Sequence, residues 1–205
     1  EYTMRLFRLR VELDYVALLL GKHLTDMALK KVRAVKAEAE KYELFSIWQS
    51  ALEQEMVLLY ETEVGKRGER EAYVQVLFEK AEVSRRLYNL HEIDHTSKKT
   101  MVEVDLIGTH PDEAGQKRLL ELANLPLLKD DDAPLSTFAR IVQLQARAFI
   151  YDGLKERELH FQAIRDLYLL HEDHPHLVFF RIRLNAIVNF LSLIHISEPT
   201  RPSTI

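Results

Sequence analysis

The stretch from Ser136 to Pro175, STFARIVQLQARAFIYDGLKERELHFQAIRDLYLLHEDHP, decides the fold. Its apolar residues recur every three or four positions in two runs, at about 136–151 and 156–171, which places them on one face of each of two α-helices. Between the runs, Gly153 in Asp-Gly-Leu can adopt the positive φ that ends many helices. Pro175 stops the second run because proline has no N–H to donate. The stretch therefore predicts an antiparallel helix hairpin whose outer apolar face needs a neighbour.

The composition favours a helical protein that binds no polyanion. The chain has 205 residues, of which 47% are hydrophobic, and only six glycines and six prolines, so long helices are expected over turn-rich β architecture. The net charge of −4 gives no reason to expect a nucleic-acid partner. The absence of cysteine excludes disulfides, thiolate zinc sites and cysteine nucleophiles. It fits a reducing compartment, so we expect a cytoplasmic protein, and we expect no membrane segment.

Further amphipathic helices are predicted before the hairpin. They cover about 6–20, 27–39, 44–59, 69–93 and 112–124. Gly21 should end the first of them, and Thr25 or Asp26 can cap the second through a side-chain oxygen. The run Gly65-Lys66-Arg67-Gly68 is interpreted as a turn because it lacks the Gly-Lys-Ser/Thr ending of a phosphate-binding loop. Ser136 is a suitable cap for the first helix of the hairpin.

The segment 96–110 gives two conflicting signals. Val102 to Leu106 alternates between apolar and acidic residues with a period of two, which is typical of a half-buried strand. A single strand would have no partner elsewhere in the chain, so we favour a helix or an irregular segment here. After Pro175, the residues from Leu177 to Phe190 predict one more helix.

The hairpin resembles a tetratricopeptide repeat over Ala148 to Pro175. The resemblance depends on the small Ala163, which we expect where the two helices cross, and on Leu167 and Leu170 behind it. The longer run from Pro126-Leu-Leu-Lys to Asn189 is similar to uncharacterised bacterial proteins of tetratricopeptide type, common in Bacteroidetes. This resemblance implies an all-α fold of antiparallel helix hairpins stacked as a solenoid fragment. It also implies a scaffold that binds a protein or peptide, with no catalytic residues and no cofactor.

Neither end of the chain resembles a natural terminus. The chain starts at Glu1 inside a helical pattern, and Leu191 to Ser203 resembles translated sequencing-adapter read-through. We therefore expect 1–190 to form one helical-repeat domain that is incomplete at both ends, followed by a non-native tail over 191–205.

One short motif could carry catalytic chemistry. His91-Glu92-Ile-Asp-His95 matches the H-E-x-x-H pattern, in which two histidines on one helix face bind zinc and the glutamate is the general base. The charged Asp94 inside the motif and the polar run 96–99 after it are typical of a solvated helix instead. Third-ligand candidates are Glu103, His110 and Glu113. We interpret the match as incidental, and a zinc-dependent hydrolase using His91 and His95 is the alternative function.

Two other residue sets need an interpretation. The histidines of 171–176 fall near a helix end, where imidazoles interact favourably with the last carbonyl groups, so we expect no metal there. Aromatic residues could line a concave groove for a peptide, or pack between repeats; these are Trp48, Tyr73, Tyr88 and Tyr151. A regulatory module whose effector domain lies outside this sequence is a third, weaker possibility.

Overall fold

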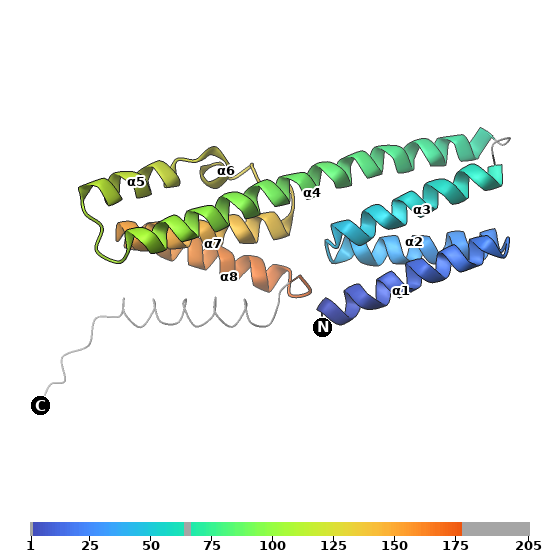
Figure 1. Ribbon diagram of the computed structural model, residues 1–205, viewed down its shortest axis with the longest axis horizontal. Coiled ribbons are helices and arrows are strands. Elements are labelled where there is room, and N and C mark those ends of the chain that lie inside the picture. The colour runs from blue at the N-terminus through green and yellow to red at the C-terminus, as the bar shows by residue number, and fades with distance from the viewer. Residues whose placement is uncertain (1, 64–66, 178–205) are drawn as a thin grey trace, which may run out of the picture. The chain divides into compact units, whose positions relative to one another are not determined.

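The computed structural model describes residues 2–63 and 67–177, and within them the fold is all-α, as expected. The described part contains eight helices and no strand (Figure 1). In chain order they are α1 (Tyr2–Gly21), α2 (Thr25–Lys41), α3 (Phe45–Glu63), α4 (Arg67–Ile107), α5 (Glu113–Ala123), α6 (Pro126–Lys129), α7 (Thr137–Leu154) and α8 (Arg157–Asp173). The single domain expected over 1–190 divides into two compact units, and the boundary in the chain lies between Asn89 and Leu90, within α4. The expected tail over 191–205 and nearly all of the helix expected from Leu177 lie outside the described residues.

The first unit is a layered arrangement of α1, α2, α3 and the N-terminal part of α4. Helix α2 packs against both α1 and α3, and α1 also contacts α3. The buried face of α2 consists of Ala28, Val32, Val35 and Ala39. Two alanines at this face let the neighbouring helices approach closely, since little side chain separates the backbones.

Three helix connections share one turn geometry. In each of them a residue other than glycine adopts the left-handed conformation: His23 (φ 57°), Glu43 (φ 48°) and Lys155 (φ 60°). The N–H of the next residue then bonds to the carbonyl five positions back, which is the Schellman arrangement. The three bonds are Leu24 to Leu19 at 3.0 Å, Leu44 to Ala39 at 2.8 Å and Glu156 to Tyr151 at 3.0 Å. The α1–α2, α2–α3 and α7–α8 connections are therefore versions of the same turn.

Two expectations about helix ends were wrong. Gly153 does not form the turn but lies buried within α7, where an added Cβ would stand 3.2 Å from Leu119 Cδ1. Its missing side chain is used for close packing, and Lys155 takes the positive φ instead. Neither Thr25 nor Asp26 caps α2, because the capping position is Leu24 and carries no side-chain cap. The Schellman turn leads directly into the helix there. By contrast, Gly21 ends α1 as predicted.

Helix α4 continues through the segment that gave conflicting signals. It runs unbroken to Ile107, so the strand pattern at Val102–Leu106 is not realised. Val104 is 9% exposed, whereas Val102 and Leu106 are exposed. The apparent alternation arises because the side chain of Val104 faces inward and those of Val102 and Leu106 face outward. Arg67 and Gly68, expected in a turn, belong to the start of α4, and Gly65 and Lys66 lie outside the described residues.

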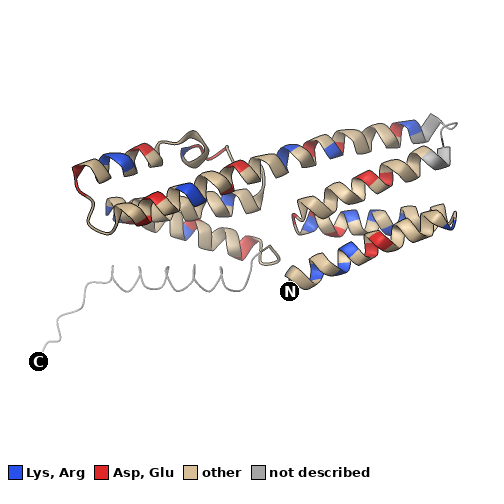
Figure 2. Cartoon of the chain, in the orientation of Figure 1, with Lys and Arg blue, Asp and Glu red and all other residues tan. Residues whose placement is uncertain are grey.

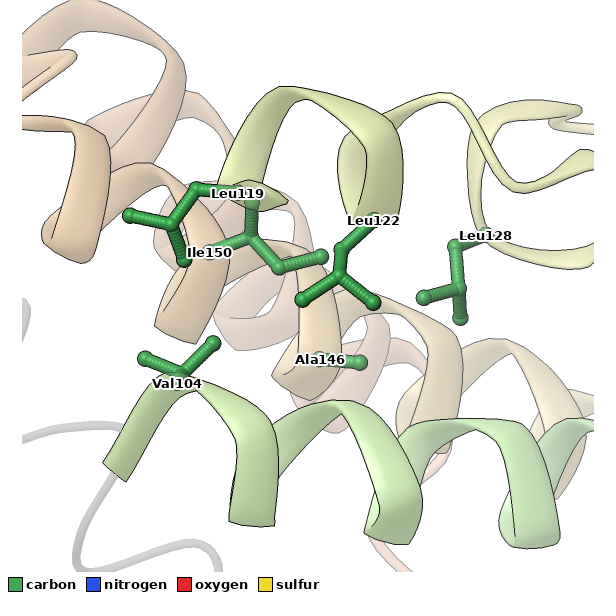
Figure 3. Packing of buried hydrophobic residues seen from close by; sticks show 6 residues of the cluster. All are labelled: Val104, Leu119, Leu122, Leu128, Ala146 and Ile150. Carbon is green, nitrogen blue, oxygen red and sulfur yellow. The ribbon is translucent and has the colours of Figure 1, made fainter. Parts of the chain in front are cut away.

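The second unit packs the C-terminal part of α4 with α5, α6, α7 and α8. Figure 3 shows its main core, to which four helices contribute: Val104, Leu119, Leu122, Leu128, Ala146 and Ile150. Ser97 on α4 donates a 3.4 Å hydrogen bond to the Val142 carbonyl of α7. The predicted hairpin is present as α7 and α8, and Ser136 caps α7 through a 3.1 Å bond from the Ala139 N–H. Helix α8 ends at Asp173, two residues before Pro175.

Buried polar groups hold the short helix α6 against α7. The Gln143 side chain is fully buried and donates to the carbonyls of Leu127 (2.9 Å) and Asp130 (2.7 Å). Arg147 donates to the carbonyls of Leu128 and Lys129. These bonds satisfy backbone carbonyls that a four-residue helix cannot pair internally. The Pro-Leu-Leu-Lys segment is therefore fixed by side chains of α7.

We expect Ala163→Leu to lower the free energy of unfolding by about 1–3 kcal/mol, the usual cost of added methylenes in a filled core. Ala163 is 4% exposed and shares a cluster with Ala148 and Ile164. The exposed Arg157 lies on the same hairpin, and Arg157→Leu should stay within about 0.5 kcal/mol of the original chain. Chemical denaturation measures both. Equal stability of the two variants would contradict packing through Ala163.

We expect His23→Gly and Lys155→Gly each to raise the free energy of unfolding by about 0.5–1 kcal/mol, because glycine adopts a positive φ without the penalty of a Cβ. The gain is reduced by the greater entropy that glycine gives the unfolded chain. As a control, Ala34→Gly at an exposed position within α2 should be destabilising by about 1 kcal/mol. Denaturant titration compares the three, and a loss of stability at both turns would show that their geometry is wrong.

Candidate interaction surface

The four aromatic residues predicted to line a groove occupy different environments. Trp48 in α3 is 5% exposed, stacks on Phe45 and donates its indole N–H to Glu79 Oε1 at 2.9 Å. Tyr151 packs against the Ala148 cluster of the second unit. Both therefore contribute to packing, the other role that the sequence allowed. Tyr73 is half-buried, and Tyr88 is 65% exposed.

Tyr88 belongs to an exposed apolar row on α4, here called the α4 stripe. Its members are Val74, Leu77, Phe78 and Tyr88, and Phe78 is 73% exposed. Val74, Leu77 and Phe78 lie at helical spacing, and Tyr88 lies on the same side of the helix ten residues after Phe78. On α3, Val57 and Tyr60 are also exposed, and the Tyr60 ring lies 6.5 Å from that of Tyr73. Single exposed apolar residues are ordinary, but a contiguous group marks an interaction site.

The inward side of the same helix also carries apolar residues. Val76 and Val83 are buried, and Glu79 lies between them at helical spacing. The sequence predicts this helix over about 69–93 from its apolar periodicity but does not show which side is buried. A helix that is apolar on opposite faces has no pattern that says which face is buried. The exposed aromatic positions could therefore not be assigned to a surface from sequence.

Polar contacts determine which side of α4 faces inward. The Glu55 carboxylate of α3 is 2% exposed and lies 2.8 Å from both Arg33 Nε and Lys36 Nζ. Lys36 also lies 3.0 Å from Glu79 Oε2 on α4. Burial by itself would lower the pKa of Lys36, but hydrogen bonds to the two glutamates outweigh it and raise that pKa. The charged network holds Glu79 inward and leaves the α4 stripe outward.

Charges beside the α4 stripe are paired within the helix. Glu82 accepts hydrogen bonds from Arg85 and Arg86, which lower the pKa of its carboxyl to about 2. These pairs are three and four residues apart, the spacing at which helix side chains meet. The apolar row is thus bordered by charges that already have partners within the same helix.

The H-E-x-x-H motif lies on an exposed part of α4. His91, Glu92 and His95 are exposed, and Asp94 forms an ion pair with Lys98 at 2.6 Å. Of the third-ligand candidates, Glu103 is 2.6 Å from Arg118 Nη2, His110 contacts Thr109, and Glu113 opens α5. No group of three His, Asp or Glu side chains suited to a metal ion occurs among the described residues. Of the histidines of 171–176, His171 is 1% exposed in α8, whereas His176 is exposed and its ring centroid lies 6.0 Å from that of His174.

In the described residues, no helix has the length and apolar character needed to cross a bilayer.

We expect the purified chain to hold no stoichiometric zinc after metal stripping and reloading, because a zinc site needs three protein ligands and the two exposed histidines supply two. Elemental analysis measures the zinc content. As a control, His91→Ala and His95→Ala should leave that content unchanged. About one equivalent of zinc that disappears in both variants would establish the hydrolase alternative as a real site.

Comparison of the chain with protein-family models, with curated proteins and with solved structures finds no match.

Proposed function

We propose that this chain is a cytoplasmic, tetratricopeptide-like helical-repeat scaffold that binds an apolar segment of another protein through the α4 stripe. The repeat interpretation is supported by the α1–α2 and α2–α3 connections, which use the same Schellman turn, and by the contact of α1 with α3 alongside α2. Successive helices that contact both the next and the next-but-one neighbour are typical of stacked hairpins. The observation that carries the binding proposal is the outward position of Phe78 and Tyr88.

Burial of Phe78 and Tyr88 would provide binding free energy of the size expected at a protein interface. A Phe or Tyr side chain can bury roughly 150–250 Å², and transfer of such a residue out of water contributes about 1.5–3 kcal/mol. Aromatic residues with aliphatic neighbours are the usual anchors of protein interfaces. Phe78 with Leu77 and Val74 beside it matches this arrangement.

The shape and charge of the surface indicate the class of partner. Apolar residues repeated along one helix suit an amphipathic helix that lays its own apolar face alongside. The bordering Glu82, Arg85 and Arg86 already pair with one another, so the partner needs no strong net charge. Figure 2 shows acidic and basic residues interspersed along the described helices, and the net charge is −4. Both facts support a protein or peptide partner over a nucleic acid.

We expect helical peptides selected by display against the intact chain to bind Phe78→Ala and Tyr88→Ala at least about tenfold more weakly, because each change removes an aromatic anchor. Gln75→Ala, an exposed polar position on the same helix, is the matched control and should bind as the original chain does. Calorimetry gives the affinities, and circular dichroism verifies that the variants remain folded. Selected peptides that bind all four proteins equally would overturn the proposal.

A further inference from the structure

Helix α1 has an exposed apolar face of its own, here called the α1 stripe. It consists of Met4, Phe7, Val11, Tyr15 and Leu18, each between 48 and 73% exposed. The opposite face of the helix is buried in the first unit and consists of Leu9, Leu13, Val16 and Leu19. Helix α1 is thus apolar on two sides, and only one of them is covered by the rest of the unit.

The α1 stripe is arranged symmetrically about Val11. Met4 and Leu18 each lie seven residues from Val11, and Phe7 and Tyr15 each lie four residues from it. A two-fold axis through Val11, perpendicular to the helix, would therefore place Met4 opposite Leu18 of the partner and Phe7 opposite Tyr15 of the partner. Such self-complementarity is what an isologous contact between two identical helices requires.

The charges beside the α1 stripe select an antiparallel orientation. Arg10 and Asp14 are exposed on one flank, and neither forms an ion pair with another described residue. In an antiparallel pair, Arg10 would lie about 3 Å along the axis from the level of the partner's Asp14, given a rise of 1.5 Å per residue. The symmetry axis generates this pair twice. A parallel pair would instead place Arg10 and Asp14 beside the other flank of the partner helix, whose Arg8 and Glu12 already form ion pairs within their own chain.

The other flank of α1 already forms ion pairs with α2 of the same chain. Arg8 pairs with Glu38, and Glu12 lies 3.3 Å from Lys31, both on α2. The surface is hollowed beside Met4, Phe7 and Val11, with Arg5, Arg8 and Glu12 at the side of this hollow. In the antiparallel arrangement the hollow faces the C-terminal side chains of the partner's stripe, Tyr15 and Leu18. Shape and charge therefore agree on one orientation.

We propose that the α1 stripe binds the α1 stripe of a second copy of this chain, as an antiparallel pair centred on Val11. Five half-to-mostly exposed side chains could bury on the order of 500 Å² per partner, about 1,000 Å² in total. That area is at the lower limit for a specific interface, so the dimer should be weak, with a dissociation constant on the order of 10–100 µM. This surface differs from the α4 stripe, and the proposal does not depend on the proposed function.

Sedimentation equilibrium of the full chain over a range of concentrations tests the proposal. The original chain should pass from monomer to dimer as concentration rises. Val11→Asp should weaken association at least about tenfold, because it places two carboxylates at the symmetry axis in an apolar contact. Ala34→Asp adds the same charge at an exposed position of α2 and should dimerise like the original chain, as should Phe78→Ala of the α4 stripe.

Charge exchange tests the orientation. Arg10→Glu and Asp14→Arg should each weaken the dimer several-fold, and the double variant should recover the original association because both cross-pairs are restored with their signs exchanged. A chain that remains monomeric at millimolar concentration would overturn the proposal. So would a dimer that survives Val11→Asp, which would place the interface elsewhere, or a double variant no tighter than the single ones, which would exclude the antiparallel register.

Discussion

The first unit depends on the burial of one carboxylate. Glu55 on α3 is almost completely buried and lies within 2.8 Å of two basic groups of α2. A buried charge that loses its partner is strongly destabilising, so the contact requires α2 and α3 to keep one relative position. Through Lys36 the same charge network reaches Glu79 on α4. A single polar cluster therefore connects three helices whose apolar faces alone could pack in several ways.

That cluster has a consequence for function. Helix α4 carries apolar residues on two sides, so hydrophobic burial by itself could draw either side into the core. Because Glu79 is held between Val76 and Val83 by Lys36 and Trp48, the side with the two valines faces the core. Phe78 and Tyr88 are left exposed. The ion network thus determines which face of the helix is available to a partner.

Turn geometry plays a comparable role along the backbone. The three Schellman turns place a residue with a Cβ in the left-handed conformation, at some cost in conformational energy. The chain keeps glycine instead at Gly153, where α7 approaches Leu119 of α5. Buried Gln143 and half-buried Arg147 likewise satisfy the carbonyls of α6. Local rules for turns are overridden in these places by the needs of packing and of hydrogen bonding.

The sequence by itself determined the fold class, the α7–α8 hairpin, its Ser136 cap and the inward position of Ala163, because apolar spacing and capping act within a few residues. It also predicted helices over much of α1 and the N-terminal part of α4. It could not show which face of each of these helices is buried. It placed the turn of the hairpin at Gly153, whereas Lys155 forms it. It also left open whether α4 continues through Val102–Leu106. Those outcomes depend on residues far apart in the chain, such as Lys36 with Glu79 and Gly153 with Leu119. Only tertiary structure brings such residues together, and it therefore decided which apolar surfaces remained exposed.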